Sequence, residues 1–427
     1  MSHRNTRQAR PRLRSRVAVI VAGVALLSWA GPGASAFWTA ASNGGSAAAA
    51  ADAVAAGATP SVSVSAGNVS LAWNAGTTLA GRPVSGYTVA RYASTSGGTK
   101  VPAGGTCAGT ITAGLGCTDQ GVPTGSWHYT VTPVLAQWNG TESARSAGAA
   151  VDTTPPTAPT VVAPAYVNST NVTAVPVSGT TEPGASIALT AKDGAAHTIT
   201  ATVTANGSGA WNAAVNLSTL NDGALTYSAV ATDTAGNQGN PATPGTASSV
   251  KDVVVPTVTK IALADAGTTG KNNSTRGKLD PGDNVTITFF EALDASTICT
   301  AWAAGADATL NGSNQVTVNI SPANSLSVTV AGTACATSRI GAVALGATYY
   351  GSGTLSYGGT GVNASALSWN ATAKTLTITL GALVPGGSPS NANQSAAAPS
   401  FTPDSGIKDL AGNSLAITPV SGSSSSF

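Results

Sequence analysis

Four cysteines are the residues whose chemistry follows most directly from their spacing. They form two local pairs, Cys107 with Cys117 and Cys299 with Cys335. In an exported chain an even number of cysteines favours disulfides. A zinc site would need clustered thiolates or imidazoles, but the sequence has no Cys-x-x-Cys and no histidine beside a cysteine. We therefore expect two disulfides and no zinc site.

Acidic residues offer a second kind of chemistry. The motif Asp-x-Ala-Gly-Asn occurs at 233–237 and again at 409–413. Carboxylate and amide oxygens are hard ligands that suit calcium, and Asp152, Glu182 and Asp233 are the candidate calcium ligands. The alternative is a type I turn in which the Asp side chain accepts hydrogen bonds from nearby backbone N–H groups. We favour the turn, because calcium takes six to eight oxygens and acids are sparse here.

Catalytic patterns are weak in this chain. Beyond residue 36 the only histidines are His128 and His197, and the Gly-x-Ser-x-Gly elbow that a Ser-His-acid triad would need is absent. Residues 248–251 match Ser-x-x-Lys, but the Ser-Asp-Asn and Lys-Thr-Gly companions are missing. A hydrolase in the third domain remains an alternative, against which the lack of a paired-carboxylate motif argues. We expect no enzyme and no catalytic residues.

Aromatic side chains could bind a ligand without catalysis. Exposed rings can form a sugar-stacking platform, and Trp138 and Trp302 are the main candidates, with Tyr349, Tyr350 and Tyr357 behind them. The competing interpretation is that these rings fill domain cores. Trp138 precedes the turn dipeptide Asn139-Gly140, and we expect it to be the most exposed.

The first 36 residues predict export. They hold six arginines and no acid, and an apolar run at 17–30 is followed by Ala34-Ser35-Ala36. This is the pattern of a signal peptide cleaved before Phe37. An uncleaved anchor is the alternative, but the run is shorter than the roughly 20 apolar residues that a membrane-spanning helix needs. We expect a secreted or wall-associated protein with no membrane contact after cleavage.

Removing this segment reverses the charge balance. The remaining chain has 13 Lys and Arg against 17 Asp and Glu. The charges are scattered singly, and a phosphate backbone would require a basic stripe. We therefore expect no nucleic-acid partner.

Short alternating runs dominate the rest of the chain. Val285, Ile287 and Phe289 alternate with threonines, and the same period of two recurs near 69–73, 316–320, 326–330 and 375–380. Period two places each apolar set on one face of a strand. We predict an all-β chain of tandem antiparallel β-sandwich domains.

Composition divides the chain further. After the signal peptide at 1–36 we predict an Ala/Gly/Ser-rich linker at 37–59, domains at 60–151, 152–255 and 256–420, and a Ser-rich tail at 421–427. The first domain boundary lies at the start of the proline-rich stretch 152–159, and the second lies near Pro256.

The first domain resembles a fibronectin type III domain. Its order of segments is 69–73, 84–89, 127–134 and 139–143. Trp73 matches the core tryptophan of that family and Tyr129 matches its tyrosine-corner residue. The absence of Arg-Gly-Asp means that integrin-type recognition is not implied.

The next two domains are similar to bacterial Ig-like domains. The segments 181–187, 209–211, 220–223 and 231–237 carry the resemblance in the second domain, with Trp211 as its core aromatic. In the third domain 279–289 and 406–415 carry it, but an insertion from Cys299 to Tyr357 departs from the family and could be an elaborated loop or an enlarged sandwich.

As a whole the chain resembles a secreted bacterial surface protein of the actinobacterial type. The resemblance implies a non-catalytic spacer and adhesion or interaction module. The alternative is a polysaccharide-binding protein that uses surface aromatics. The expected partners are a cell-wall or extracellular polysaccharide or protein. Self-association through sheet edges is a further hypothesis, since few charges protect them.

Overall fold

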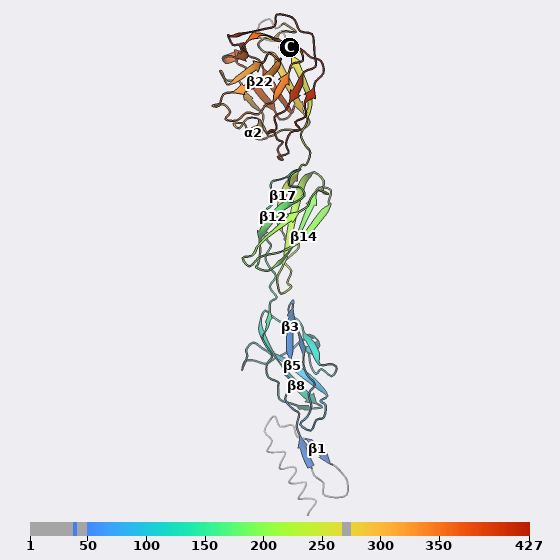
Figure 1. Ribbon diagram of the computed structural model, residues 1–427. Helices are drawn as coiled ribbons and strands as arrows, with labels where there is room; N and C mark the ends of the chain where they lie inside the picture. Colours follow the sequence, from blue (N-terminus) through green and yellow to red (C-terminus); the bar gives the residue numbers. More distant parts are fainter. Residues whose placement is uncertain (1–36, 41–48, 267–274) are drawn as a thin grey trace, which may run out of the picture. The chain divides into compact units, whose positions relative to one another are not determined.

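The computed structural model describes residues 37–40, 49–266 and 275–427. The predicted signal peptide lies outside these residues. Within them the chain is built almost wholly from antiparallel β-sheets (Figure 1), as the alternating runs predict. By backbone proximity it divides into two compact units. Of the described residues, the first unit includes those up to 157 together with 184–186 and 231–242, and the second includes those in 158–183, 187–230 and from 243 onward.

The first sandwich packs a three-stranded sheet against a five-stranded one. The order of the smaller sheet is β3-β4-β7, and that of the larger is β10-β8-β5-β6, with β9 also paired to β8. Alternation explains its core, since Val69 and Leu71 of β4 are buried and the residues between them are not. The strands are β3 Ser61–Ser65, β4 Asn68–Ala72, β5 Gly86–Tyr92, β6 Val101–Pro102, β7 Gly116–Asp119, β8 Gly125–Leu135, β9 Trp138–Asn139 and β10 Ala149–Val151.

The predicted aromatic positions of this sandwich are buried. Trp73 is 6% exposed and packs edge-on against Tyr87, with ring centroids 5.5 Å apart. Tyr129 is fully buried, but its hydroxyl donates to the side chain of Asp119 (3.0 Å). A tyrosine-corner hydroxyl would instead bond to a nearby backbone group.

The second sandwich faces a five-stranded sheet, β11-β17-β16-β13-β14, with the pair β12-β15. Trp211 on β15 is 3% exposed and lies in its core, as predicted. The strands are β11 Tyr166–Val167, β12 Val175–Thr180, β13 Ser186–Asp193, β14 Thr198–Thr204, β15 Ala210–Val215, β16 Gly223–Thr232 and β17 Gly245–Lys251.

The third sandwich is enlarged. The insertion from Cys299 to Tyr357 therefore adds strands to the sandwich and is not an elaborated loop. A five-stranded sheet, β18-β19-β27-β26-β20, is accompanied by a seven-stranded sheet, β28-β25-β21-β22-β23-β30-β31. The residues 299–357 contribute five strands to these two sheets and so help to build the core. A separate ribbon pairs β24 with β29.

The strands of the five-stranded sheet are β18 Val258–Ala264, β19 Asn284–Phe289, β20 Ala308–Leu310, β26 Ala366–Asn370 and β27 Thr375–Thr379. The others are β21 Val316–Ile320, β22 Ser325–Val330, β23 Ala342–Ala344, β24 Tyr350–Gly353, β25 Leu355–Gly358, β28 Ala382–Leu383, β29 Gly387–Pro389, β30 Ser400–Thr402 and β31 Val420–Ser421. The described helices are single turns, η1 Gly105–Cys107, α2 Ala295–Ile298 and η2 Gly361–Asn363.

Described residues of the predicted linker and of the Ser-rich tail take part in strand pairing and packing. In the 37–59 stretch, β1 (Phe37–Ala40) pairs with β2 (Ala49–Asp52), and Val54 is 8% exposed. Gly57 donates to Thr141 O (3.0 Å), and a Cβ on Gly57 would lie 1.9 Å from a carbonyl oxygen, so only glycine permits this approach. The part of this stretch nearest residue 60 therefore belongs to the first sandwich.

The Ser-rich stretch 421–427 is also part of a domain. Val420 and Ser421 pair with β30, and Ser425 accepts a hydrogen bond from Leu263 N through its hydroxyl (3.0 Å). Phe427 is fully buried against Tyr349, with ring centroids 5.3 Å apart. Burial of this aromatic ring overrides the polar composition of the segment.

Both predicted disulfides are present. Cys107 joins Cys117 in the first sandwich, and Cys299 joins Cys335 in the third, with Cα atoms 5.1 and 5.6 Å apart. The first pins η1 to β7, and the second closes a longer loop inside the insertion.

Candidate functional site

The most elaborate polar cluster is built around the second Asp-x-Ala-Gly-Asn motif. Asp409 accepts hydrogen bonds from the backbone N–H and the side-chain amide of Asn413, both at 2.8 Å. Gly412 has φ +95°, a conformation that explains glycine at this turn position. Asp409 and Asn413 are 2% and 0% exposed, so the two polar ends of the turn are buried.

Asn413 connects this turn by hydrogen bonds to other parts of the same unit. Its side-chain N–H donates to the backbone carbonyl of Asp252 (2.9 Å), and its side-chain carbonyl accepts from Ser169 N (2.8 Å). Both hydrogens of this buried amide nitrogen are donated and its oxygen accepts one bond, so Asn413 links three separate stretches of chain.

The first Asp-x-Ala-Gly-Asn motif has the same geometry. Asp233 accepts from the backbone and side chain of Asn237, both at 2.8 Å, and Asn237 donates to the carbonyl of Asp152 (3.0 Å). Both motifs therefore adopt the turn favoured from the sequence. Each uses its final Asn to hold the aspartate at which an interdomain linker begins.

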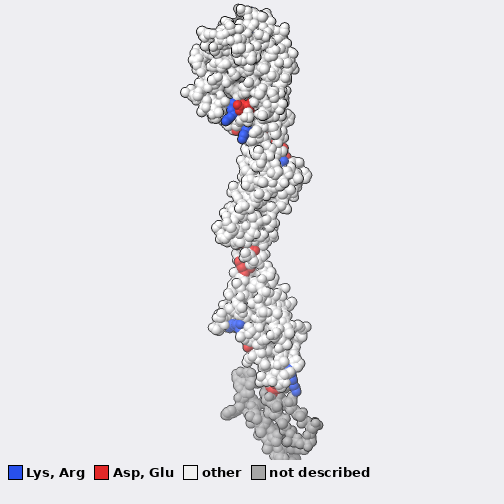
Figure 2. Space-filling model, in the orientation of Figure 1, with Lys and Arg blue, Asp and Glu red and all other residues white. Residues whose placement is uncertain are grey.

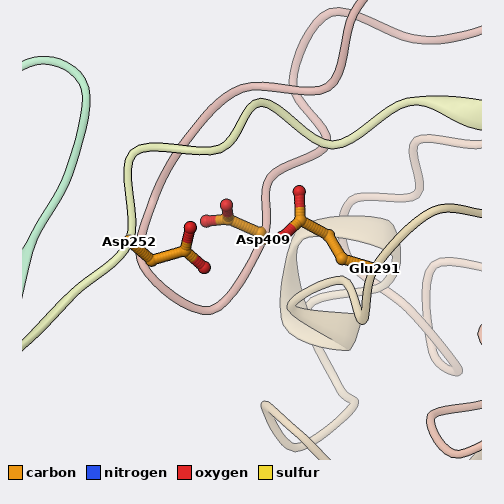
Figure 3. Close-up of side chains that lie close together, drawn as sticks. All are labelled: Asp252, Glu291 and Asp409. Atoms are coloured by element: carbon orange, nitrogen blue, oxygen red, sulfur yellow. The ribbon is translucent and has the colours of Figure 1, made fainter. Parts of the chain in front are cut away.

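Two further carboxylates join Asp409 in the second unit. Asp252 follows β17, Glu291 follows β19, and the three side chains turn toward one another (Figure 3), with their oxygens within 4.8 Å. Glu291 Oε1 is buried and has no hydrogen-bond partner within the described residues. Negative charge is therefore concentrated here in partly water-excluded surroundings.

This concentration shifts proton affinities. Burial raises the pKa of Glu291 to about 7, and the carboxylates of Asp252 and Asp409 add to the increase. Burial likewise raises the pKa of Asp252; the N–H of Val254 opposes the shift and Asp409 reinforces it. A buried carboxylate beside other carboxylates loses hydration and meets repulsion, and both effects favour the protonated form.

The cluster has two chemical capabilities. Three carboxylates at this separation could supply part of the six to eight oxygens that calcium takes. They could equally share protons near neutral pH, since a raised pKa makes a carboxyl group available as a proton donor. Asp252, Glu291 and Asp409 are the described residues that could hold a metal ion in this way.

The structure brings together only part of the calcium set named from the sequence. Asp152 and Asp233 both line a groove of about 540 Å³ in the first unit, whereas Glu182 is exposed and does not line it. Both oxygens of Asp233 already accept hydrogen bonds from Asn237. Burial raises the pKa of Asp233, but these bonds outweigh it, and the pKa lies below its usual value.

Sequence reasoning singles out Asp409 through its motif and misses Asp252 and Glu291. A signal for Asp252 does exist. Like Asp152, it is followed by proline within four residues, and each of these aspartates opens a linker. Glu291 lies just past a strand with no neighbouring motif, and no local pattern marks it.

The two aromatic candidates separate clearly. Trp138 on β9 is 40% exposed, as expected for a ring beside a turn. Trp302 is 7% exposed and packs in the core of the third sandwich, as do Tyr349 and Tyr357, each 1% exposed. Trp302 therefore presents no surface ring to a ligand, and of the three tyrosines named only Tyr350 is partly exposed.

Charged side chains elsewhere serve the fold. Fully buried Asp119 accepts from Arg91 (2.8 Å), from the Tyr129 hydroxyl and from Gly104 N (2.6 Å). Buried Lys251 donates to Leu220 O and to Asp222, both at 2.8 Å. On the face in Figure 2 charged side chains are few and most of the surface is uncharged.

No described helix has the length and apolarity that crossing a membrane requires.

The described residues form a chain of tandem antiparallel β-sandwiches. Comparison with protein-family models found no match, and comparison with curated proteins found none either.

Solved structures of low similarity do align with the chain. One is the tetra-tandem repeat in the extending region of a large adhesion protein (16% identity, 88% of this chain and 90% of that one, TM-score 0.24). Another is a 1.5-MDa bacterial ice-binding adhesin (13%, 86% and 96%, 0.28). A third is the FN1–FN3 domains of chicken CNTN1 (9%, 87% and 99%, 0.24).

Proposed function

We propose that this protein acts outside the cell as a non-catalytic spacer and adhesion module. Its sandwiches, joined by proline-containing linkers, would display contact surfaces to a cell-wall or extracellular polysaccharide or protein. Export would depend on residues 1–36, and the two disulfides suit an oxidising compartment.

The observation that carries this proposal is that an asparagine side chain forms a hydrogen bond to the first residue of each of two linkers. Asn237 bonds to the carbonyl of Asp152, and Asn413 bonds to that of Asp252. Two turns of the same motif and geometry thus each use a side-chain amide to bind the start of a linker. A chain whose task is to carry domains has a physical reason to repeat this device, because a bonded linker loses conformational freedom.

The use of ionisable groups supports a non-catalytic role. In the described part of the chain His128 contacts the backbone carbonyl of Ser146 (3.0 Å), and His197 contacts Asp193 (2.9 Å). Neither contact places the ring nitrogen against a serine hydroxyl, which a base-activated nucleophile requires. Asp119 and Lys251 are likewise committed to neighbouring residues.

The test follows the protein from export to contact. The full chain, with residues 1–36, is produced in a bacterial host and the cell fractions are assayed. We expect protein in the medium or wall fraction beginning at Phe37, beads coated with it that adhere to bacterial cells, and no turnover of ester, glycoside or peptide substrates. A variant lacking 1–36 and albumin-coated beads are the controls. Cytoplasmic retention of the full chain, or turnover that a single substitution abolishes, would contradict the proposal.

Polysaccharide binding through surface aromatics is the second candidate. It is supported by the exposure of Trp138, and it loses the support of Trp302, whose ring is buried. If this alternative holds through Trp138, then Trp138→Ala abolishes binding to insoluble glycans.

A further inference from the structure

A shallow groove crosses part of the third sandwich. Its volume is about 280 Å³, and it is formed where β21, β22 and β25 lie beside β24. A groove of this size suits one small ring better than a drug-sized ligand. Its polar lining consists of Asn319, Ser321, Ser327, Tyr350, Thr354 and Ser356.

Strand register aligns three of these side chains. Asn319 on β21 pairs with Ser327 on β22 and with Ser356 on β25. Directly paired residues project from the same face of a sheet, so an amide and two hydroxyls form one row across three strands. The neighbouring Val318 is buried in the core, which places the row on the opposite face.

Hydrogen bonds hold the central amide in place. Ser356 donates to Asn319 Oδ1 (2.8 Å), and Asn319 Nδ2 donates to Thr329 (3.1 Å). Ser356 is only 8% exposed although it lies on the outward face. An amide oxygen has two lone pairs and an amide nitrogen two hydrogens, so Asn319 keeps bonding capacity for a ligand while its orientation is fixed.

Tyr350 supplies an aromatic wall. Its hydroxyl donates to Gly353 O (2.7 Å), and its backbone N–H donates to Asn324 (2.8 Å). The residue is therefore anchored at its hydroxyl and at its backbone. The residue is partly exposed and is among those that line the groove. A fixed ring offers an apolar face at little entropic cost.

The lining selects a class of ligand by what it offers. It presents hydroxyls, an amide, one aromatic residue and the apolar residues Ile320, Pro322 and Leu355, and no charged side chain is among its residues. Phosphates and carboxylates would find no cation here, and organic cations would find no carboxylate. A sugar ring has C–H faces that pack on an aromatic ring and hydroxyls that exchange hydrogen bonds with amides. We propose that this groove binds a neutral sugar residue of an extracellular glycan, an inference that deepens the proposed adhesion function by naming its ligand class.

The test measures sugar binding by the full chain. Affinity electrophoresis is run in gels containing dextran, mannan, xylan or galactan, with alginate as an anionic comparison. We expect at least one neutral polysaccharide to retard the protein and alginate not to. Ser327 is exposed, so Ser327→Trp should fill the groove without removing an observed hydrogen bond, and it should weaken binding at least tenfold. Tyr350→Ala should weaken it similarly.

A matched control removes a hydroxyl from the other sheet. Thr375 on β27 belongs to the five-stranded sheet and does not line the groove, so Thr375→Ala should leave binding unchanged. Circular dichroism establishes that each variant is folded. The inference is overturned if the wild-type chain binds no neutral polysaccharide, if it binds alginate alone, or if Trp138→Ala abolishes binding while Ser327→Trp does not. Those outcomes leave the export and bead-adhesion tests untouched, so the two proposals can fail separately.

Discussion

The side-chain amide of Asn413 donates to the backbone carbonyl of Asp252, 161 residues earlier in the chain, at 2.9 Å. Asn237 and Asp152 repeat the relationship at 3.0 Å across 85 residues. The two pairs differ in burial, because Asn413 is fully buried and Asn237 is only partly so. Variants of the two asparagines can therefore be compared to test the effect of burial on the same hydrogen bond.

Asn413→Ala should destabilise the third sandwich by about 2–4 kcal/mol, because it leaves several buried groups without partners. Asn237→Ala should cost about 1 kcal/mol, since water can replace the lost bonds at a partly exposed site. Hydrogen–deuterium exchange of the full chain, read sandwich by sandwich, measures both effects. Equal costs for the two variants would argue against burial as the cause.

Glu291→Gln should raise the melting temperature at pH 8. The wild-type carboxyl has its pKa raised to about 7 in the folded state, against an ordinary value of 4.5, so it protonates more readily when folded. The contribution of this carboxyl group to stability is therefore greatest below pH 4.5 and is lost as the pH rises through 7. The variant avoids this loss, and we expect a gain of about 1 kcal/mol at pH 8, because solvent screens a partly exposed group.

Glu142 is the control for Glu291, because its pKa is shifted in the opposite direction. Burial raises the pKa of Glu142, but Lys100 and the Tyr92 hydroxyl outweigh it and hold the pKa below its usual value. Glu142→Gln should therefore reduce stability at pH 8 and have a smaller effect in acid. Calorimetry from pH 4 to 8 follows both variants, and parallel pH profiles would contradict the assignment.

The disulfides should stabilise to different extents. Closing the 36-residue separation of Cys299 and Cys335 should contribute about 4 kcal/mol in the chain-entropy model, against about 3 kcal/mol for the 10-residue separation of Cys107 and Cys117. Replacing each pair by alanine and measuring urea denaturation tests the order. Reduction of the wild-type protein should reproduce the effect of both pairs removed, and a larger loss for the shorter loop would contradict the model.

Asp119→Ala should destabilise the first sandwich by about 3–5 kcal/mol. The change leaves the guanidinium of Arg91 and the hydroxyl of Tyr129 without their buried acceptor. Asp119→Asn keeps an acceptor oxygen and a similar volume, so it should cost less. Urea denaturation followed by tryptophan fluorescence gives both values, and a loss below about 1 kcal/mol for the alanine variant would be inconsistent with a paired buried charge.

Strand periodicity was sufficient to predict the sheets. The apolar positions of β19, Val285, Ile287 and Phe289, are all buried, because alternation is a local property of the backbone. Phe427 shows where local patterns fail. One aromatic residue in a serine-rich stretch has no period, and its burial depends on Tyr349, which lies 78 positions away in the sequence.

The polar sites are less predictable, because they too depend on contacts between residues that are distant in the sequence. The turn at 409–413 could be recognised from its motif, but its association with Asp252 and Glu291 depends on how strands from distant parts of the sequence end together. The row of Asn319, Ser327 and Ser356 depends on strand register, which isolated polar residues do not reveal.

The scarcity of charge on the visible face has a consequence for how this protein could hold a partner (Figure 2). Mobile ions weaken attraction between exposed charges over a Debye length of about 8–10 Å, but they have little effect on hydroxyl, amide and aromatic contacts. Adhesion through such groups should remain nearly constant from dilute to concentrated electrolyte, whereas a charge-based adhesive would release.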